Sequence, residues 1–161
     1  MITSNIHLGE DVNIDPTTSI NNVTIGNRVK IAKLCSIYGS VDHPLEMGDD
    51  CIIAMLTIIN GFAAKIVIGK NVSIAQRVNI MADSGPSASP LMQQYFPMKA
   101  GDIKIGDHSW IGANTIIMPG VELGECCFVT ANSFVNRSFP SYSIIGGNPA
   151  KLIRRFENDR M

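Results

Sequence analysis

The sequence is poor in the residues on which several common classes of protein depend. Its 161 residues include one Trp, three His and four Cys, and its 13 Lys and Arg residues are outnumbered by 14 Asp and Glu residues. Without a basic excess the chain has little to hold a phosphate backbone, so we do not expect it to bind nucleic acid. The four Cys include no Cys-x-x-Cys pair, and we expect no disulfide framework.

Long apolar runs are also missing. The two most apolar uncharged stretches, residues 51–64 and 108–121, are 14 residues each and contain Thr, Asn and Gly. Such stretches are too short and too polar to span a bilayer, so we expect no membrane span. Residues 1–7 lack a basic start followed by an apolar run. We therefore expect no secretory signal and a cytoplasmic protein.

Isoleucine is abundant and evenly spaced. There are 23 Ile residues, and aliphatic residues recur at every sixth position, which indicates an internal repeat. Eighteen such positions fall into six sets of three. They are Leu8, Ile14 and Ile20; Ile25, Ile31 and Ile37; Met47, Ile53 and Ile59; Ile68, Ile74 and Ile80; Ile105, Ile111 and Ile117; and Leu123, Val129 and Val135.

Two other positions of the repeat have a fixed character. The residue after the first member of each set is Gly, as expected where a backbone turns tightly and can need a positive φ. These residues are Gly9, Gly26, Gly48, Gly69, Gly106 and Gly124. The fifth position of the hexapeptide is small or β-branched, as at Val29, Cys51 and Ser109, and the same phase includes Val41 and Ser84. We predict that this residue and the large aliphatic residue both point inward.

The repeat predicts an all-β fold. Three short strands separated by turns would close one triangular coil, and stacked coils would pair as in a parallel sheet. We therefore predict a parallel β-helix of about six coils over residues 8–138, within a single domain of residues 1–161. Extra residues follow the third strand of coils two, three and four, so their loops should all leave at the same corner.

Two segments fall outside the repeat. The largest loop, residues 86–104, contains Tyr95 and Phe96, and long loops on rigid scaffolds are usually functional. After the last coil, Asn148 can cap a helix and Pro149 suits the first helical position. Residues 149–157 are therefore predicted to form a short C-terminal α-helix.

Two stretches carry a more specific signal. Residues 105–124 read Ile-Gly-Asp-His-Ser-Trp-Ile-Gly-Ala-Asn-Thr-Ile-Ile-Met-Pro-Gly-Val-Glu-Leu-Gly, and residues 147–155 read Gly-Asn-Pro-Ala-Lys-Leu-Ile-Arg-Arg. Both resemble the hexapeptide-repeat acyltransferases, and within them the galactoside, maltose and polysaccharide acetyltransferase branch. The resemblance implies a left-handed β-helix, a homotrimer, acetyl-CoA as donor, and active sites between neighbouring subunits that take a sugar or nucleotide-sugar acceptor.

The resemblance also implies which residues contact the donor. Trp110, Ala113 and Ala131 would line a groove for the pantetheine arm. The phosphates of the nucleotide end would lie near three basic residues, Arg137, Lys151 and Arg154. Several flexible cations suit a 3′-phosphate and a pyrophosphate, although the charges of the last two residues also suit a solvated helix face near its C-terminus.

The general base of the family has no counterpart in this chain. The resemblance places it as the His of a Gly-His-Pro segment at the start of the long loop, where this chain has Gly85 before Pro86. Three residues are candidates to replace it, of which His43, in Val-Asp-His-Pro, is the weakest. His108, in coil five, should point outward, and Asp83 adjoins the vacant position. His43 is expected two layers away in a surface loop.

Because the family base is missing, three functions stay open. The first is acetyl transfer to a sugar hydroxyl, as in surface polysaccharide, which needs a base because the pKa of a hydroxyl lies far above neutral pH. The second is acetyl transfer to a nucleotide-linked amino sugar, since an amine with a pKa of about 8 is partly neutral and needs no enzymic base. The third is a β-helical scaffold without catalysis.

Zinc chemistry is a further activity that a β-helical trimer can support. A carbonic anhydrase of that kind needs three His from adjoining surfaces to hold the metal. The three His residues of this chain are His7, His43 and His108, which lie far apart in the sequence. We therefore predict no metal site.

Overall fold

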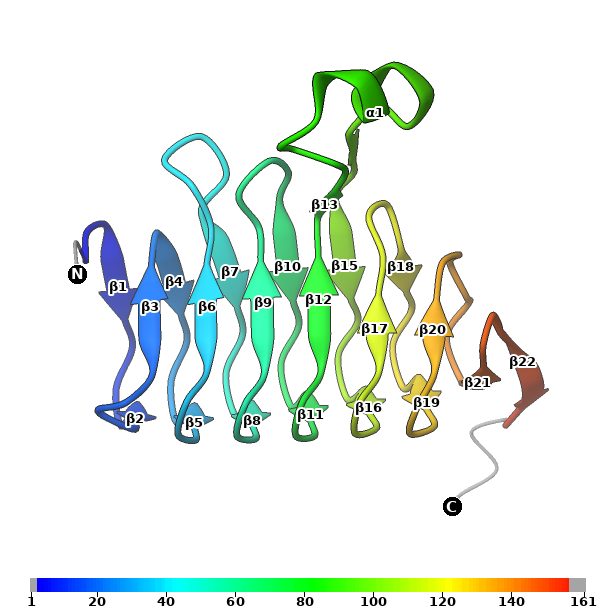
Figure 1. Cartoon of the computed structure of the whole chain (residues 1–161). Coiled ribbons are helices and arrows are strands. Elements are labelled where there is room, and N and C mark those ends of the chain that lie inside the picture. Colours follow the sequence, from blue (N-terminus) through cyan, green and yellow to red (C-terminus); the bar gives the residue numbers. More distant parts are fainter. Residues whose placement is uncertain (1–2, 157–161) are drawn as a thin grey trace.

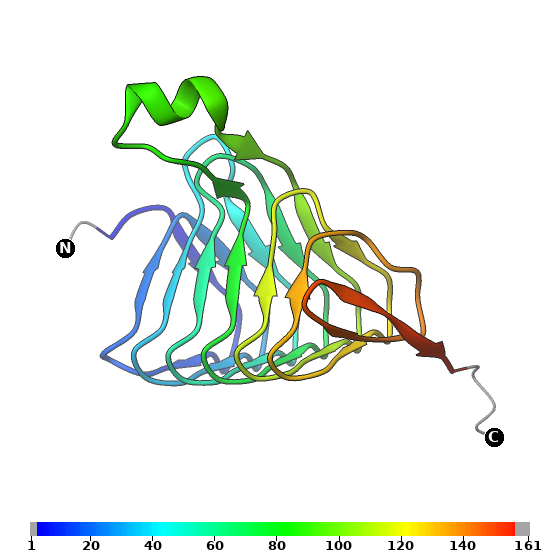
Figure 2. The same ribbon diagram turned by 45° about the vertical axis from the view of Figure 1, so that its right-hand side comes forward.

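The computed structural model describes residues 3–156 and shows a triangular prism of short strands wound about one axis (Figures 1 and 2). Three parallel sheets form its walls. Sheet A contains β1 (Ile6–Leu8), β4 (Val23–Ile25), β7 (Leu45–Met47), β10 (Ile66–Ile68), β15 (Ile103–Ile105) and β18 (Glu122–Leu123). Sheet C contains β3 (Ser19–Asn21), β6 (Ser36–Tyr38), β9 (Ile58–Asn60), β12 (Asn79–Met81), β17 (Ile116–Ile117) and β20 (Phe134–Val135).

Sheet B lies between these two along the chain and is longer. Its first six strands belong to the coils, and its last two extend the sheet beyond them. They are β2 (Asn13–Ile14), β5 (Lys30–Ile31), β8 (Ile52–Ile53), β11 (Ser73–Ile74), β16 (Trp110–Ile111), β19 (Phe128–Val129), β21 (Ser143–Gly147) and β22 (Ala150–Arg155). The predicted left-handed parallel β-helix of about six coils is confirmed.

The register of the sheets follows the hexapeptide phase. Ile68 of β10 lies between Met47 and Ile105 in sheet A, and the equivalent residues of the other sheets align in the same way. These side chains form one buried column along the axis. Because a fully buried Ile contributes about 1.5–3 kcal/mol relative to exposure, the column accounts for much of the stability of the fold.

The glycines of the repeat have a different role from the one that we predicted. None of the six has a positive φ, which occurs two residues later in the same turn, as at Asp11, Asn71 and His108. Instead, successive coils approach too closely for a side chain. A Cβ at Gly106 would lie 2.4 Å from the carbonyl carbon of Gly124 in the next coil. Close packing therefore explains these glycines, and the turn conformation does not.

The extra residues all leave between sheets C and A, as predicted (Figure 1). The hexapeptide phase ends there, because inserted residues no longer stack on the next coil. Val41, expected to point inward, is 76% exposed in the first of these loops. Ser84, also expected inward, lies in the base of the long loop. The same corner thus carries all the residues inserted between coils.

The long loop is an ordered arm. Its base is a ribbon of two antiparallel strands, β13 (Asp83–Ser84) and β14 (Lys99–Ala100), and its tip contains the helix α1 (Pro90–Tyr95). Ser89 caps this helix, and its Oγ accepts a hydrogen bond from Met92 N at 3.2 Å. The predicted loop end at residue 104 is two residues too late, because Ile103 already pairs with Ile66 in sheet A and is buried.

The predicted C-terminal α-helix at residues 149–157 is wrong. Residues 150–155 form β22, which pairs antiparallel with β21, and residue 157 lies outside the described residues. The cause is tertiary, because β21 offers an unpaired edge at the end of sheet B and β22 satisfies it. Arg155 Nη2 also donates to Ser141 O at 3.0 Å. Within residues 3–156 there is no helix long and apolar enough to cross a membrane.

Candidate active site

A pocket lies against the base of the long arm. Its volume is about 400 Å³. It is lined by Ser84, Gly85, Pro86, Tyr95, Phe96, Pro97, Lys99 and Met118. Because Met118 follows β17 of coil five and the arm leaves coil four, the pocket faces the C-terminal coils. It is therefore on the same side of the arm as the residues expected to bind the donor.

Gly85 lies where the family resemblance places a catalytic His. A Cβ at this position would lie 2.8 Å from the Cα of Met98. The arm folds back on itself here, so the two backbone segments leave no room for a side chain. The structure thus gives a packing reason for the glycine, and no imidazole can occupy this position without moving the backbone.

Asp83 lies on the other side of the ribbon. It pairs with Ala100, whereas Ser84 pairs with Lys99, and successive residues of a strand point to opposite faces. Asp83 Oδ2 accepts a hydrogen bond from Ala63 N at 3.3 Å. Burial first, and then the Asp83 carboxylate, raise the pKa of the Tyr38 phenol. Asp83 therefore faces coils two and three and connects the arm to their corner loops.

His108 lies at a different corner. It occupies the turn between sheets A and B with a φ of 59°, its backbone N donates to Lys70 O at 2.9 Å, and the residue is exposed as predicted. Asp83 lies at the corner between sheets C and A. Within one protomer, the two candidate bases are therefore not brought together, and their catalytic roles stay predictions.

Aromatic residues mark the C-terminal part of sheet B. Trp110 is 53% exposed and stacks on Phe128, with 4.3 Å between ring centroids and 16° between ring planes. Ala113 and Ala131 follow in the turns between sheets B and C, where Asn132 N donates to Ala113 O at 2.8 Å. Three of the predicted donor contacts thus lie on neighbouring coils along one edge of the prism.

Two of the predicted basic residues join this surface through a β-bulge. Lys151 is opposite Gly146, and Arg154 is opposite Ile144. Since these partners are two residues apart on β21, both basic residues lie on one face. Ile144 is also opposite Phe128. The irregularity in β22 thus places the two charges in line with the stacked aromatic rings.

Arg137 does not join them. It follows β20 at the corner between sheets C and A, and its guanidinium lies 5.0 Å from the centroid of the Phe139 ring. Its predicted contact with the donor stays a prediction. A residue that the sequence did not single out, Phe128, belongs to the surface instead. The sequence could have indicated Phe128, because it lies one coil of 18 residues after Trp110 and so stacks next to it in sheet B.

The pocket residues Ser84, Lys99 and Met118 were not predicted. The hexapeptide phase says nothing of residues that fold back on one another outside the coils. Tyr95 and Phe96 were noticed only as aromatic residues in a long loop. Within the described residues, His, Cys, Asp and Glu side chains form no cluster of three or more that could hold a metal ion.

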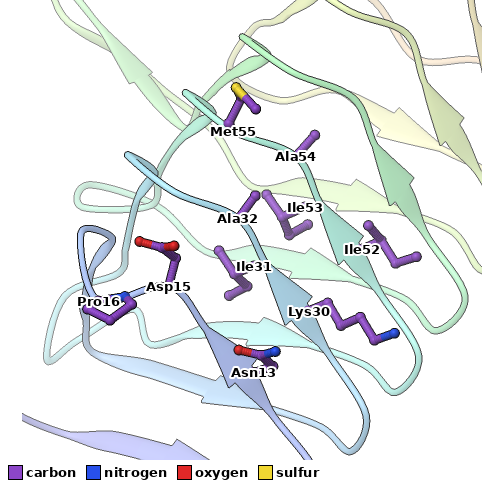
Figure 3. A pocket seen from close by; sticks show the side chains of 10 residues that line it. All are labelled: Asn13, Asp15, Pro16, Lys30, Ile31, Ala32, Ile52, Ile53, Ala54 and Met55. Carbon is purple, nitrogen blue, oxygen red and sulfur yellow. The ribbon is translucent and has the colours of Figure 1, made fainter.

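A second hollow, of about 480 Å³, lies on sheet B near the N-terminal end (Figure 3). Strands β2, β5 and β8 form its floor, and Lys30, Ile52 and Met55 are among the residues that line it. It adjoins the turns between sheets B and C, and several apolar side chains are exposed in these turns and at the start of β9. These are Leu34, Met55, Leu56 and Ile58. This hollow lies at the opposite end of the sheet from the aromatic residues.

Known proteins resemble this chain in sequence. The family described as bacterial transferase hexapeptide (six repeats) matches residues 102–137. A probable macrolide acetyltransferase of Lysinibacillus sphaericus is 36% identical over 130 residues, which are 77% of this chain and 71% of that protein. A chloramphenicol acetyltransferase of Agrobacterium fabrum is 35% identical over 121 residues, which are 72% of this chain but only 57% of that protein.

Solved structures resemble it in fold. One is AntD, an N-acyltransferase from Bacillus cereus in complex with dTDP and 3-hydroxybutyryl-CoA. It superposes with a TM-score of 0.82 at 29% sequence identity, over 92% of this chain and 82% of that one. The likeness extends beyond the repeat to nearly the whole chain.

Proposed function

Because the chain belongs to the hexapeptide-repeat acyltransferases, we propose that it transfers an acetyl group from acetyl-CoA to the amino group of a sugar. One observation supports the amine over the hydroxyl. The pocket beside the arm is lined by no His, Asp or Glu among the residues that the structure describes. Gly85, packed on Met98, occupies the position of the family base.

The chemistry needs little from the protein beyond positioning. The neutral amine nitrogen attacks the carbonyl carbon of the thioester, a C–N bond forms and the C–S bond breaks. The amine loses one proton, and the CoA thiolate accepts a proton as it leaves. Since an amine with a pKa of about 8 is partly neutral near pH 7, positioning two reactants in contact supplies most of the acceleration.

The donor is proposed to lie along the C-terminal end of sheet B. The exposed Trp110 and the backbone near Ala131 would contact the pantetheine arm, and Lys151 and Arg154 would face the phosphates. This proposal is supported by their placement on one surface and by the acyl-CoA in the AntD structure. Flexible cations on an exposed strand suit several phosphate groups.

We also propose that the protein is a homotrimer. The surface proposed to bind the donor, hereafter the donor surface, is formed by Trp110, Phe128, Lys151 and Arg154 on sheet B. The arm and its pocket leave between sheets C and A. A donor on one protomer can therefore meet the pocket of a neighbour but not its own. The four exposed apolar residues of the B–C corner, with the adjoining hollow, would supply the contact. Clustered exposed apolar side chains of this kind mark protein interfaces.

Transfer to a sugar hydroxyl is the second candidate. It is favoured by His108, which is exposed two residues before Trp110 and so lies near the proposed donor. At a subunit contact, its imidazole would act as the base that a hydroxyl requires. The third function, a scaffold without catalysis, is less well supported, because a scaffold has no use for a surface that binds CoA.

A thiol-release assay with acetyl-CoA separates these functions. We expect release with amino sugars, free or nucleotide-linked, and a rate that rises with pH through the amine pKa near about 8. Sugars that carry only hydroxyls should give no release. Transfer to a hydroxyl that is lost in His108→Ala, but kept in the matched variant His43→Ala, would overturn the proposal. No thermal stabilisation by millimolar CoA would indicate the scaffold.

A further inference from the structure

The corner between sheets B and C changes in character at coil four. In coils two to six, each turn at this corner has a residue with a positive φ. These residues are Leu34, Leu56, Arg77, Asn114 and Asn132. The first two are exposed and apolar, and the last two are joined by a hydrogen bond from Asn114 Nδ2 to Asn132 Oδ1 at 3.1 Å. Arg77 therefore lies between the apolar contact proposed for the trimer and the polar turns beside the donor surface.

Coil four also leaves polar groups without partners near this corner. Arg77 is exposed, and no ion pair joins it to any residue of the range 3–156. By contrast Arg28, in a turn between sheets A and B, binds Asp50 at 2.7 Å. Two residues after Arg77, the buried Asn79 Oδ1 has no hydrogen-bond partner among the described residues. Because buried polar atoms are nearly always paired, we expect a bound molecule or a neighbouring protomer to supply the partner.

The stacking of the turns places Arg77 at the thioester end of the proposed donor. Asn114 N donates to Gln76 O at 3.1 Å, so the turn that contains Arg77 lies directly below the turn that contains Ala113. The phosphates are proposed to lie beyond coil six and the pantetheine arm beside coils six and five. Arg77 lies one coil further along, a distance of about 4.8 Å. The arm with its pocket also leaves coil four, so in a trimer with its axis along the prism the two reactants meet at this level.

We propose that Arg77 is a further catalytic residue, whose guanidinium group binds the oxyanion that forms during acyl transfer. This inference rests on the proposed function. When the amine nitrogen attacks the thioester carbon, an electron pair moves from the C=O bond onto the oxygen, and the guanidinium N–H groups donate to that oxygen. When the pair returns, the C–S bond breaks. The CoA thiolate leaves and takes up the proton that the amine loses. Because arginine stays protonated, Arg77 stabilises charge and does not replace the missing base.

A donor analogue tests the proposal without an acceptor. S-carboxymethyl-CoA carries a carboxylate at the end where acetyl-CoA carries its acetyl group, so its charge stands in for the oxyanion. Isothermal titration of the full chain should show that it binds about 10-fold or more tightly than acetyl-CoA. In Arg77→Met this preference should disappear while the affinity for acetyl-CoA is unchanged, and Arg77→Lys should keep part of it. The matched variant Lys33→Met changes an exposed lysine at the same corner, two coils away, and should bind like the wild type.

Turnover gives a second measurement. In the thiol-release assay with amino sugars, Arg77→Met should lower kcat by about 100-fold and leave the KM for acetyl-CoA nearly unchanged, because the contact forms only in the transition state. Light scattering should give the same mass for this variant as for the wild type. That result separates a catalytic role from a contact that merely holds the trimer together.

The outcomes distinguish the inference from the proposed function. Equal binding of the two CoA derivatives by the wild type, or an unchanged preference in Arg77→Met, would overturn the inference while the N-acyltransferase function stands. A fall in kcat that accompanies loss of the trimer would also overturn it. If the preference depends on Arg77 but no amine releases thiol, the proposed function is contradicted and Arg77 remains assigned to an anion at the donor end. Binding of neither CoA derivative would contradict both.

Discussion

At the scale of single residues, glycine in four of the six coils makes room for a polar side chain that follows in the next layer, and at Gly48 and Gly106 it makes room for the backbone of that layer. Asn27 Oδ1 accepts a hydrogen bond from Glu10 N at 2.8 Å, and a Cβ on Gly9 would lie 2.3 Å from that oxygen. Asp107 Oδ1 repeats the contact with Lys70 N at 2.9 Å. Short polar side chains thus satisfy backbone amides at the corner only because their neighbour has no side chain.

Gly85 allows a prediction at this scale. Gly85→His restores the residue type of the family base, but its Cβ must displace the backbone of Met98, which lies 2.8 Å away. We expect the variant to gain no transfer to sugar hydroxyls and to lose about 1–3 kcal/mol of stability, the usual cost of overpacking. Thiol release with hydroxyl sugars and urea denaturation measure the two effects.

The control is Gly61→His, in another loop of the same corner, where the nearest atom to a Cβ is 3.3 Å away. It should be less destabilising. If Gly85→His instead transferred acetyl to hydroxyls, the arm would be mobile enough to accept a catalytic base, and the preference for amines would have another cause.

At the scale of elements, the hairpin of β21 and β22 does two things. It covers the end of sheet B, where Ile145 pairs with Val129 and is buried. Its bulge also turns Lys151 and Arg154 to the same face. A regular strand would place residues three apart on opposite faces. The bulge therefore brings two basic residues at a spacing of three onto one face of the strand. A helix, as predicted, would also have placed residues three apart on one face.

The double variant Lys151→Met/Arg154→Met tests this surface. We expect CoA affinity to fall by about 10-fold or more, because two charge-assisted contacts to phosphate are lost. Isothermal titration with CoA is the measurement. Arg155→Met serves as the control, since Arg155 pairs with Ser143 on the inner face and donates to Ser141 O. Unchanged CoA affinity in the double variant would place the donor elsewhere.

At the scale of the whole molecule, two halves of the proposed reaction lie on different edges of the prism. The proposed donor surface occupies sheet B and its corner with sheet C, whereas the arm leaves at the corner between sheets C and A. A rigid β-helix cannot bring these edges together by bending, because its buried column of Ile residues is continuous. The proposed association of protomers would bring the two edges together and complete a site.

The oligomeric state can be tested at the apolar corner. Light scattering after size-exclusion chromatography should give about three times the chain mass of 17.4 kDa. Leu34→Glu/Leu56→Glu places two charges in the proposed contact, so it should give a monomer that releases no thiol. Leu91→Glu changes an exposed apolar residue of α1, away from this corner, and should stay trimeric. A wild-type monomer, or a trimeric double variant, would refute the assembly.

The repeat could be predicted in detail because it is local. Each coil repeats the same short pattern, so Ile68, Ile74 and Ile80 indicate three walls without knowledge of their partners. The same hexapeptide phase places Trp110 outside the inward-pointing positions. It also predicts that the three loops leave at one corner. Prediction failed where the phase ended, at Val41 and Ser84, because inserted residues are placed by contacts that the repeat does not encode.

Amino-acid order by itself therefore determined the β-helix, its register, the position of the arm and the family to which the chain belongs, since all of these depend on short-range spacing. Only the tertiary structure decided that residues 150–155 form a strand, that its bulge aligns Lys151 and Arg154 with Trp110, and that Gly85 is held against Met98. These depend on an open sheet edge and on a chain that folds back on itself. Such contacts join residues whose pairing no local pattern specifies.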